Sequence, residues 1–498
     1  MTAQKLEIDF PRPDLSTWQN LVAKTLAGKP LDTLQHTLAG QVFEPIYGAS
    51  EQPSPSIDGT ASFVAPLRVG DSLELARERA DSFFIGPEWT VSQILAAGFK
   101  NDDTVRIHTD AASAKALDDK IGWASVVFSA DVAGVANVDG AAWEQRGADS
   151  VVELAILVGG ILDAARNGAT EFNVTLAMTP MVFESIAKRR ALADVFGRIQ
   201  TWWGQPLKLH VHGVTSARTF SLYDAHTNLL RTGCAAFAGL VAGVDTLTCL
   251  PHDWRCETTS DGFRIALNIP HVLSKEAHLL RTFDAAGGSG YIDALTQSFA
   301  KATWELVLGL EAKQGLALGF TDLIRPKIDA ARAARVKDLR TRKAVLVGVN
   351  DFVDSLQIQP ARAFGPSGHP SEIPFDADEW EQVARRAQGV KVGISSLGEP
   401  KRHKARREYV DRLLRAGGFT VVDTAQDKSP DVVFICGHDD DYASLGIAEA
   451  KSLAGKTVVV AGRPGDLQDT WSAAGVSNFV FMGADVLAVL ESLVEGRS

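Results

Sequence analysis

The stretch VKVGISSLGEPKRHKARREYV, residues 390–410, contains a transition from a predicted strand to a predicted helix, and our assignment of the fold depends on it. Its first eight residues are mostly apolar, as in a strand that is buried on both faces of a parallel sheet. Gly398 and Pro400 then mark a turn, and five Lys or Arg and one His within residues 401–407 open a predicted helix. An α/β domain usually binds its ligand at such a strand-to-helix turn, so these residues are the first candidates for a site.

Four further apolar runs follow this strand, with helix-like segments between them. They are FTVVDT, DVVFICG, TVVVAGRPG and NFVFMGAD, all within residues 419–485. Strands that alternate with helices form parallel sheets, because parallel neighbours need a crossover connection. Five strands in this span predict a flavodoxin-like, doubly wound domain over residues 388–498.

The same alternation extends over most of the chain before this domain. The predicted strands are TVRIHTD (104–110), WASVVFSAD (123–131), EFNVTLAMT (171–179), LKLHVHGVT (207–215) and VDTLTCLP (244–251). Residues 150–168 and 180–203 are predicted helices, and the first ends in the stop signal Arg-Asn-Gly. Repeated βα units over residues 61–350 predict a (β/α)8 TIM barrel, and therefore an α/β fold class.

A chain of 498 residues is too long for one hydrophobic core, so we expect at least two domains. Residues 1–60 are predicted to form an N-terminal arm, interrupted near Pro53 and Pro55, that lies on another surface. Residues 351–387 are rich in turn-forming residues and have no periodicity, so we predict a linker.

The composition is typical of a soluble globular protein, with 45% hydrophobic and 22% charged residues. The net charge of −11 argues against nucleic-acid binding and gives no reason to expect contact with a membrane. The sequence opens without a secretory signal pattern, and no apolar run is long enough to span a bilayer. Four Cys make no disulfide framework, so we expect a reducing, cytoplasmic location.

Several segments along the chain resemble the methylmalonyl-CoA mutase family of adenosylcobalamin-dependent acyl-CoA mutases. They are QVFEPIYGASE (41–51), RGADSVVELAILVGGILDAAR (146–166), ESIAKRRALADVF (184–196), LKLHVHGVTS (207–216), DAAGGSGYIDALT (284–296) and VLVGVNDF (345–352). The predicted barrel, linker and flavodoxin-like domain also have the family's order. Within the family, the sequence is most similar to the small, non-catalytic subunit of the heterodimeric enzyme.

The resemblance implies an enzyme that interconverts methylmalonyl-CoA and succinyl-CoA, with adenosylcobalamin supplying the radical chemistry. It also implies that the cofactor and the acyl-CoA substrate are bound by a large catalytic subunit, with which this chain forms a heterodimer. This chain would then contribute an interface rather than catalysis, since function depends on the site and not on the fold. Two other interpretations stay open: a mutase with its own divergent cobalamin site, and a binding protein that protects a mutase.

The resemblance also defines what a cobalamin site in this chain would require. In cobalamin-binding chains of the family, the loop after the first strand of the last domain reads Asp-x-His-x-x-Gly. The His ligates cobalt, the Asp orients its imidazole, and the Gly lets the backbone pass close to the cofactor. If His403 is the counterpart of this His, Lys401 stands at the Asp position and Arg406 at the Gly position.

A second alignment starts from the Leu-Gly pair that precedes the loop. It places Pro400, Arg402 and Ala405 at the Asp, His and Gly positions. A guanidinium has no lone pair to offer cobalt. Neither alignment preserves the pattern, so we expect a degenerate loop and no cofactor-binding residues in this chain. The Lys401–Arg407 cluster is then either a solvated helix face or a docking surface for an acidic partner.

The barrel segments also depart from the catalytic members of the family. Those chains carry an Arg-x-Tyr-Ala-Gly stretch before the first barrel strand, whereas this sequence has no Tyr between residues 48 and 222 and keeps only Arg68 there. His210, predicted at the end of a barrel strand, matches the family's His that hydrogen-bonds the substrate carbonyl. The residues after it do not match, so we expect a vestigial His210 and no catalytic residues.

Two weaker patterns remain. CLPHDWRC (249–256) brings Cys249, His252 and Cys256 together, but the spacing matches no common zinc pattern and a fourth ligand is not evident, so we expect no metal. AAGGSG (285–290) could cradle a phosphate, although glycine runs also form turns that bind nothing.

Overall fold

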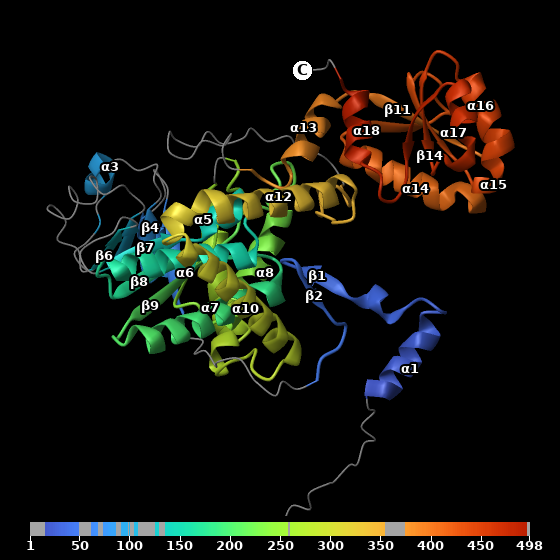
Figure 1. Cartoon of the computed structure of the whole chain (residues 1–498). Helices are drawn as coiled ribbons and strands as arrows, with labels where there is room; N and C mark the ends of the chain where they lie inside the picture. The colour runs from blue at the N-terminus through green and yellow to red at the C-terminus, as the bar shows by residue number, and fades with distance from the viewer. Residues whose placement is uncertain are drawn as a thin grey trace, which may run out of the picture.

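The computed structural model of the chain describes residues 15–48, 61–67, 73–85, 91–97, 99, 104–107, 125–128, 135–256, 259–353 and 374–495 (Figure 1). They form two α/β units and part of an N-terminal arm. Arg68 lies outside these residues. Within the described ranges, no helix is both long and apolar enough to cross a lipid bilayer.

The first unit is built on a sheet of eight parallel strands. They are β3 (Ser62–Leu67), β4 (Ser82–Ile85), β5 (Thr104–Ile107), β6 (Ser125–Phe128), β7 (Val135–Asp139), β8 (Glu171–Met178), β9 (Lys208–Thr215) and β10 (Thr246–Thr248). Sequence neighbours pair from β3 to β6 and from β7 to β10, and β10 pairs with β3. Because the last strand pairs with the first, the sheet agrees with the predicted barrel in strand direction and order. The β6–β7 side adjoins residues 129–134, which are not among those described.

Helices connect these strands and continue after the last one. Those that connect the strands are α2 (Leu73–Arg79), α3 (Val91–Ala96), α5 (Ala141–Arg146), α6 (Ser150–Arg166), α7 (Val182–Trp203) and α8 (Thr227–Val241). After β10 come α9 (Ser260–His271), η2 (Val272–Glu276), η3 (Leu279–Arg281), α10 (Gly290–Ala312), α11 (Leu316–Gly319), η4 (Phe320–Ile324) and α12 (Arg325–Arg340).

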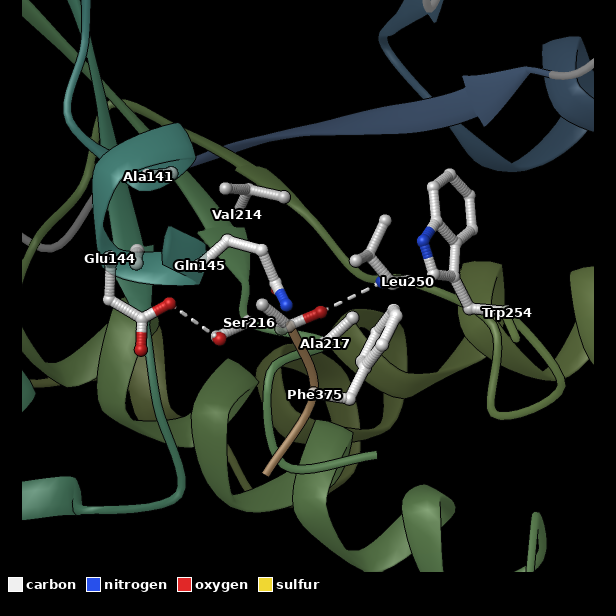
Figure 2. A pocket seen from close by; sticks show the side chains of 11 residues that line it. Ala141, Glu144, Gln145, Val214, Ser216, Ala217, Leu250, Trp254 and Phe375 are labelled. Atoms are coloured by element: carbon white, nitrogen blue, oxygen red, sulfur yellow. Dashed lines mark hydrogen bonds between the residues drawn. The ribbon is translucent and has the colours of Figure 1, made fainter. Parts of the chain in front are cut away.

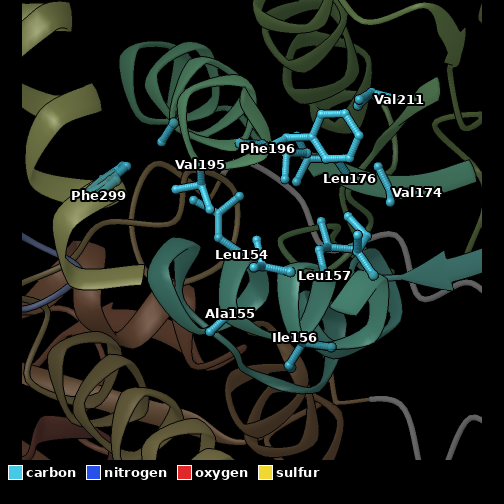
Figure 3. Packing of buried hydrophobic residues seen from close by; sticks show 14 of the residues in the cluster. Leu154, Ala155, Ile156, Leu157, Val174, Leu176, Val195, Phe196, Val211 and Phe299 are labelled. Atoms are coloured by element: carbon cyan, nitrogen blue, oxygen red, sulfur yellow. The ribbon is translucent and has the colours of Figure 1, made fainter. Parts of the chain in front are cut away.

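The main hydrophobic core lies between β7–β9 and the helices α6, α7, α8 and α10 (Figure 3). Along β8, Phe172, Val174 and Leu176 point into this core, while the residues between them face the other side of the sheet. Each fully buried side chain of this size contributes roughly 2 kcal/mol to stability. The sheet therefore presents one apolar face to the helices and leaves its inner face to other residues.

Helix α6 shows how local sequence sets the boundaries of these elements. The Asp149 carboxylate accepts a hydrogen bond from the Val152 N–H at 2.9 Å and caps the first turn. The helix ends at Arg166, and Gly168 follows with a φ of +93°, a conformation that glycine adopts without strain. The predicted stop signal is confirmed.

The second unit is a sheet of five parallel strands in the order β12-β11-β13-β14-β15. They are β11 (Lys391–Ser396), β12 (Thr420–Asp423), β13 (Val432–Cys436), β14 (Thr457–Ala461) and β15 (Val476–Val480), so all five predicted strands are confirmed. This is the flavodoxin-like strand order, in which the sequence order reverses between β11 and β13.

Helices cover both faces of this sheet. They are α14 (Pro400–Ala416), α15 (Asp439–Asp441), η6 (Tyr442–Gly446), α16 (Ile447–Ser452), η7 (Gly465–Leu467), α17 (Gln468–Ala473) and α18 (Val486–Leu493). Helices α14 and α18 pack on one face, and α16 and α17 on the other.

The region predicted as a linker contains a helix, α13 (Asp378–Arg386). Its residues Trp380 and Val383 are at most 2% exposed and belong to the core of the second unit. The prediction failed here because turn-forming residues before the helix obscured its short apolar face. Residues 354–373 of the same range lie outside the described part of the chain.

The described part of the arm contains α1 (Leu15–Thr25), η1 (Leu31–Leu34) and a hairpin of β1 (His36–Leu38) and β2 (Gln41–Phe43). Phe43 is 3% exposed and belongs to the core of the first unit, so the hairpin lies on the barrel helices. A Cβ at Gly290 would stand 1.8 Å from the Gly48 carbonyl oxygen, so the start of α10 must be glycine for the arm to pass.

Candidate functional site

A pocket of about 120 Å³ lies at the carboxyl ends of β7, β8, β9 and β10 (Figure 2). The active sites of barrel enzymes lie at this end of the sheet, because the loops that follow the strands converge there. The wall is mostly apolar, with Ala217, Leu250 and Phe375 among its residues. Glu144 and Ser216 supply polar atoms, so the pocket combines an apolar wall with a few fixed hydrogen-bonding groups.

The inner face of the sheet is polar below this pocket. The strand register places Asp139, Thr175, His212 and Thr246 side by side on β7, β8, β9 and β10. Barrel interiors are usually filled by branched aliphatic residues. Asp139 and Thr175 are only half-buried, so the described part of the inner face is lined by polar side chains rather than by aliphatic ones.

Two histidines of β9 belong to this inner face. His212 is 3% exposed, and its Nδ1 and Nε2 lie 2.9 Å and 3.2 Å from the hydroxyls of Thr246 and Thr248. His210 lies 3.1 Å from the Thr246 hydroxyl and 4.0 Å from the Asp245 carboxylate, at a side-chain exposure of 33%. His210 is the third residue of β9, toward the amino end of the strand and away from the pocket.

His212 is the histidine that the sequence analysis missed. Both histidines point inward because residues two apart share a face of a strand. Only the three-dimensional register, which places His212 opposite Thr175 and Thr246, distinguishes the buried one.

A buried ion pair adjoins the pocket wall. The Lys188 ammonium on α7 lies 2.6 Å from the Glu153 carboxylate on α6, and both side chains are at most 1% exposed. Both groups also bond to the backbone of Ala177, through its carbonyl at 2.6 Å and its N–H at 2.8 Å. Burial raises the pKa of Glu153 to about 7, although Lys188 acts in the opposite direction. The pair fixes α6 and α7 to the end of β8.

A second charged group extends from the pocket toward the segment before α13. Ser216 donates a hydrogen bond to Glu144 at 2.7 Å, and the Arg218 guanidinium lies 2.9 Å from the same carboxylate. Asp376 lies 3.8 Å from Arg218 and 3.0 Å from Arg335. Burial by itself would lower the pKa of Arg218, but the carboxylates of Glu144 and Asp376 outweigh it, and the pKa is raised.

The strand-to-helix turn of the second unit has no extended loop. Helix α14 begins at Pro400, so the Lys401–Arg407 cluster is helical from its first residue. The Arg402 guanidinium lies 2.9 Å from the Asp441 carboxylate, which follows β13. Arg406 lies 2.6 Å from Asp439. The cluster is therefore held by acidic residues at the point of the sheet where ligands bind in related folds.

Tyr442 fills the neighbouring space between the ends of β13 and β14. Its ring is 3% exposed and packs against Trp471. Its hydroxyl accepts a hydrogen bond from the Gly437 N–H at 3.1 Å and donates one to the Ala461 carbonyl at 2.5 Å. Arg406 lies over the ring at 5.2 Å and donates to the Gly437 carbonyl at 2.7 Å.

His403 lies on α14 with its Nδ1 at 3.0 Å from the Leu397 carbonyl oxygen. It borders a shallow groove of about 620 Å³ along the helix, together with Lys404 and Arg407. Lys401 and Lys404 are 80% and 74% exposed, so part of the cluster forms a solvated helix face. Ala405, which stood at the Gly position in the second alignment, lies on α14 one turn after Lys401.

The two weaker patterns receive no support as sites. Among the described residues, no group of three or more His, Cys, Asp or Glu side chains could hold a metal ion. Cys249 and Cys256 are buried, and burial raises the pKa of the Cys249 thiol. In the glycine-rich segment, Ser289 caps α10 by accepting from the Ile292 N–H at 3.4 Å.

Comparison with known proteins gives this geometry its context. Residues 133–365 match the family model described as methylmalonyl-CoA mutase. Over these residues, the chain is similar to the methylmalonyl-CoA mutase family. It is 28% identical to the methylmalonyl-CoA mutase small subunit of Porphyromonas gingivalis, over 62% of this chain and 56% of that subunit. It is 31% identical to the small subunit of Streptomyces virginiae, over 64% of this chain and 55% of that subunit.

The mutase large subunit of Porphyromonas gingivalis is also similar, at 25% identity over 47% of this chain and 31% of that subunit. This chain spans a little more than half the length of the small subunits named above.

Proposed function

We propose that this chain is the small subunit of a methylmalonyl-CoA mutase and supports a large catalytic subunit without binding adenosylcobalamin itself. The observation that carries the proposal is the ion-paired start of α14, where Arg402 and Arg406 engage Asp441 and Asp439. In the holoenzyme, adenosylcobalamin on the partner would supply the radical chemistry that interconverts methylmalonyl-CoA and succinyl-CoA. The relatives named as small subunits support this assignment.

We infer that the residues at this turn do not fit adenosylcobalamin. A cobalt-binding loop needs an imidazole oriented by a carboxylate, whereas the residue two positions before His403 is Lys401. Room for the cofactor's nucleotide tail would be needed between β13 and β14, where the Tyr442 side chain lies. Pro400 starts a helix where an extended loop would be required.

The remaining parts of the chain fit a supporting role. We propose that the first sheet closes into a complete (β/α)8 barrel whose His210 is vestigial, because His210 lies toward the amino end of β9 and away from the pocket. The domains would be the arm to residue 60, the barrel to about residue 350, a linker, and the second unit, which starts with α13. The described part of α1 buries no residue, and Leu15 and Leu21 are 57% and 59% exposed, so its apolar face is available to a partner chain.

The proposal places the heterodimer in the cytoplasm. All four cysteines are free, as expected in a reducing compartment. The partner would bind the acyl-CoA.

The test is cofactor retention by the chain alone and with its large subunit. Each sample is mixed with adenosylcobalamin and gel-filtered, and the corrin absorbance of the protein peak is measured. We expect a colourless lone chain and about one corrinoid per heterodimer, since one cofactor serves one catalytic chain. Stoichiometric corrinoid on the lone chain would instead establish an independent cobalamin site.

Two variants identify the ligand if colour appears. His403→Ala removes the one imidazole of the cluster, and Lys404→Ala removes its exposed neighbour. A cobalt ligand at His403 requires that only the first variant lose corrinoid. Under our proposal, both variants leave corrinoid uptake and mutase activity of the heterodimer unchanged.

A further inference from the structure

A short segment of the chain lies across the mouth of the barrel. We call residues Pro374–Asp378 the strap. Its Phe375 side chain is 9% exposed and packs with Ala217 and Leu250 in the pocket wall, as Figure 2 shows. The strap thus contributes one side of a pocket whose other sides are the carboxyl ends of the strands.

The strap is fixed by backbone hydrogen bonds on both sides of Phe375. The Asp376 N–H donates to the Arg218 carbonyl at 2.9 Å. The Gln145 side chain donates to the Pro374 carbonyl at 3.0 Å. These contacts join the strap to the segment after β9 and to α5, so two walls of the barrel mouth hold it.

The carboxylates of the strap also engage the arginines near the mouth. Asp376 lies 3.0 Å from Arg335, and Asp378 lies 2.6 Å from Arg255. The Arg255 guanidinium stacks over the Phe375 ring at 4.1 Å. Arginine is well suited to binding a carboxylate or a phosphate of a ligand, but here each guanidinium is bound to a carboxylate of the chain itself.

We propose that the strap is a built-in plug, which closes the carboxyl face of this barrel to ligands. Its carboxylates occupy the arginines that an acidic ligand would otherwise bind. The pocket that remains beside it, about 120 Å³, is smaller than a cavity of roughly 150 Å³ that takes up one benzene molecule. The inference deepens the proposed function, on which its biological meaning rests, because it names the element that closes the site.

The test measures the access of a small reagent to the pocket. Ala217→Cys places a thiol under Phe375, and the exposed Cys234 provides an internal reference. Iodoacetamide labelling of each thiol is followed by mass spectrometry. With the strap intact, we expect the thiol at position 217 to react at least about tenfold more slowly than Cys234, because burial limits contact with the reagent.

Adding Phe375→Ala to this variant should accelerate labelling at position 217 at least about tenfold relative to Cys234. Phe375→Leu, which keeps an apolar plug, should leave it slow. Labelling of the buried Cys436 in the second unit reports whether a variant has unfolded. If Phe375→Ala unfolds, Asp376→Ala replaces it, since it removes the ion pair of the strap with Arg335 and Asp376 does not line the pocket.

Fast labelling at position 217 with the strap intact, or an unchanged rate in Phe375→Ala or in the variant that replaces it, overturns the plug. The experiment needs neither corrinoid nor a partner chain. A lone chain that binds corrinoid but shows the expected labelling would refute the proposed function and leave the plug standing.

Discussion

At the scale of single residues, Glu153 is a carboxylate that folding removes from water. It is fully buried, and its pKa is raised to about 7 from an ordinary value of 4.5. The folded protein therefore retains a proton that the unfolded chain releases between about pH 4.5 and 7. The resulting stabilisation is present below pH 4.5 and is lost as the pH rises through 7.

We therefore expect Glu153 to make the free energy of unfolding fall between about pH 5 and pH 7. Urea denaturation across this range measures the free energy of unfolding of the wild type and of Glu153→Gln. The value for the wild type minus that for the variant should decrease with rising pH. Glu171→Gln, at a carboxylate that is 46% exposed and paired with Lys208, is the matched control and should show no such trend. A difference that stays constant with pH would contradict the raised pKa.

At the scale of elements, the sequence predicted regular structure wherever apolar periodicity was strong. The five strands of the second unit are apolar runs flanked by turn residues, and all were found close to their predicted positions. Helix α13 was missed because its buried residues, such as Trp380 and Val383, occupy only two turns after a stretch rich in turn signals. Periodicity has little weight in so short a segment.

The candidate site was less predictable, because its contacts join segments that are far apart in the sequence. The resemblance to the mutase family predicted that the cluster at Lys401–Arg407 departs from the pattern of a cobalamin loop. It gave no means of pairing Arg402 with Asp441, since that contact depends on two strands lying side by side. The strap was missed for the same reason, since Phe375 meets Ala217 only after folding.

The junction of β13 with η6 should depend on the volume and the hydroxyl of Tyr442. Tyr442→Phe leaves the buried Gly437 N–H without its partner, and we expect a loss of about 1–2 kcal/mol. Tyr442→Ala also removes the ring from the core, so the loss should reach about 3–5 kcal/mol. Chemical denaturation measures both. Equal losses in the two variants would mean that the ring does not fill the space between β13 and β14.

At the scale of the whole molecule, arginines join the two units. Arg340, at the end of α12, lies 3.0 Å from Glu379 on α13 and 2.7 Å from Glu491 on α18. Arg255, which follows β10, lies 2.9 Å from Glu381 on α13 and is 8% exposed. Helix α13, which packs in the second unit, therefore provides carboxylates that pair with arginines of the first unit.

Because α13 packs in the core of the second unit, these contacts should make both units unfold together. We expect one calorimetric transition for the wild type and two for the double variant Arg255→Met with Arg340→Met. Arg255 contributes most, since removing one partner of a buried ion pair costs about 3–5 kcal/mol. Arg415→Met, which breaks a pair with Asp411 inside α14, is the control and should keep the single transition. A single transition in the double variant would mean that apolar contacts, such as Ala384 with Leu222, are sufficient to couple the units.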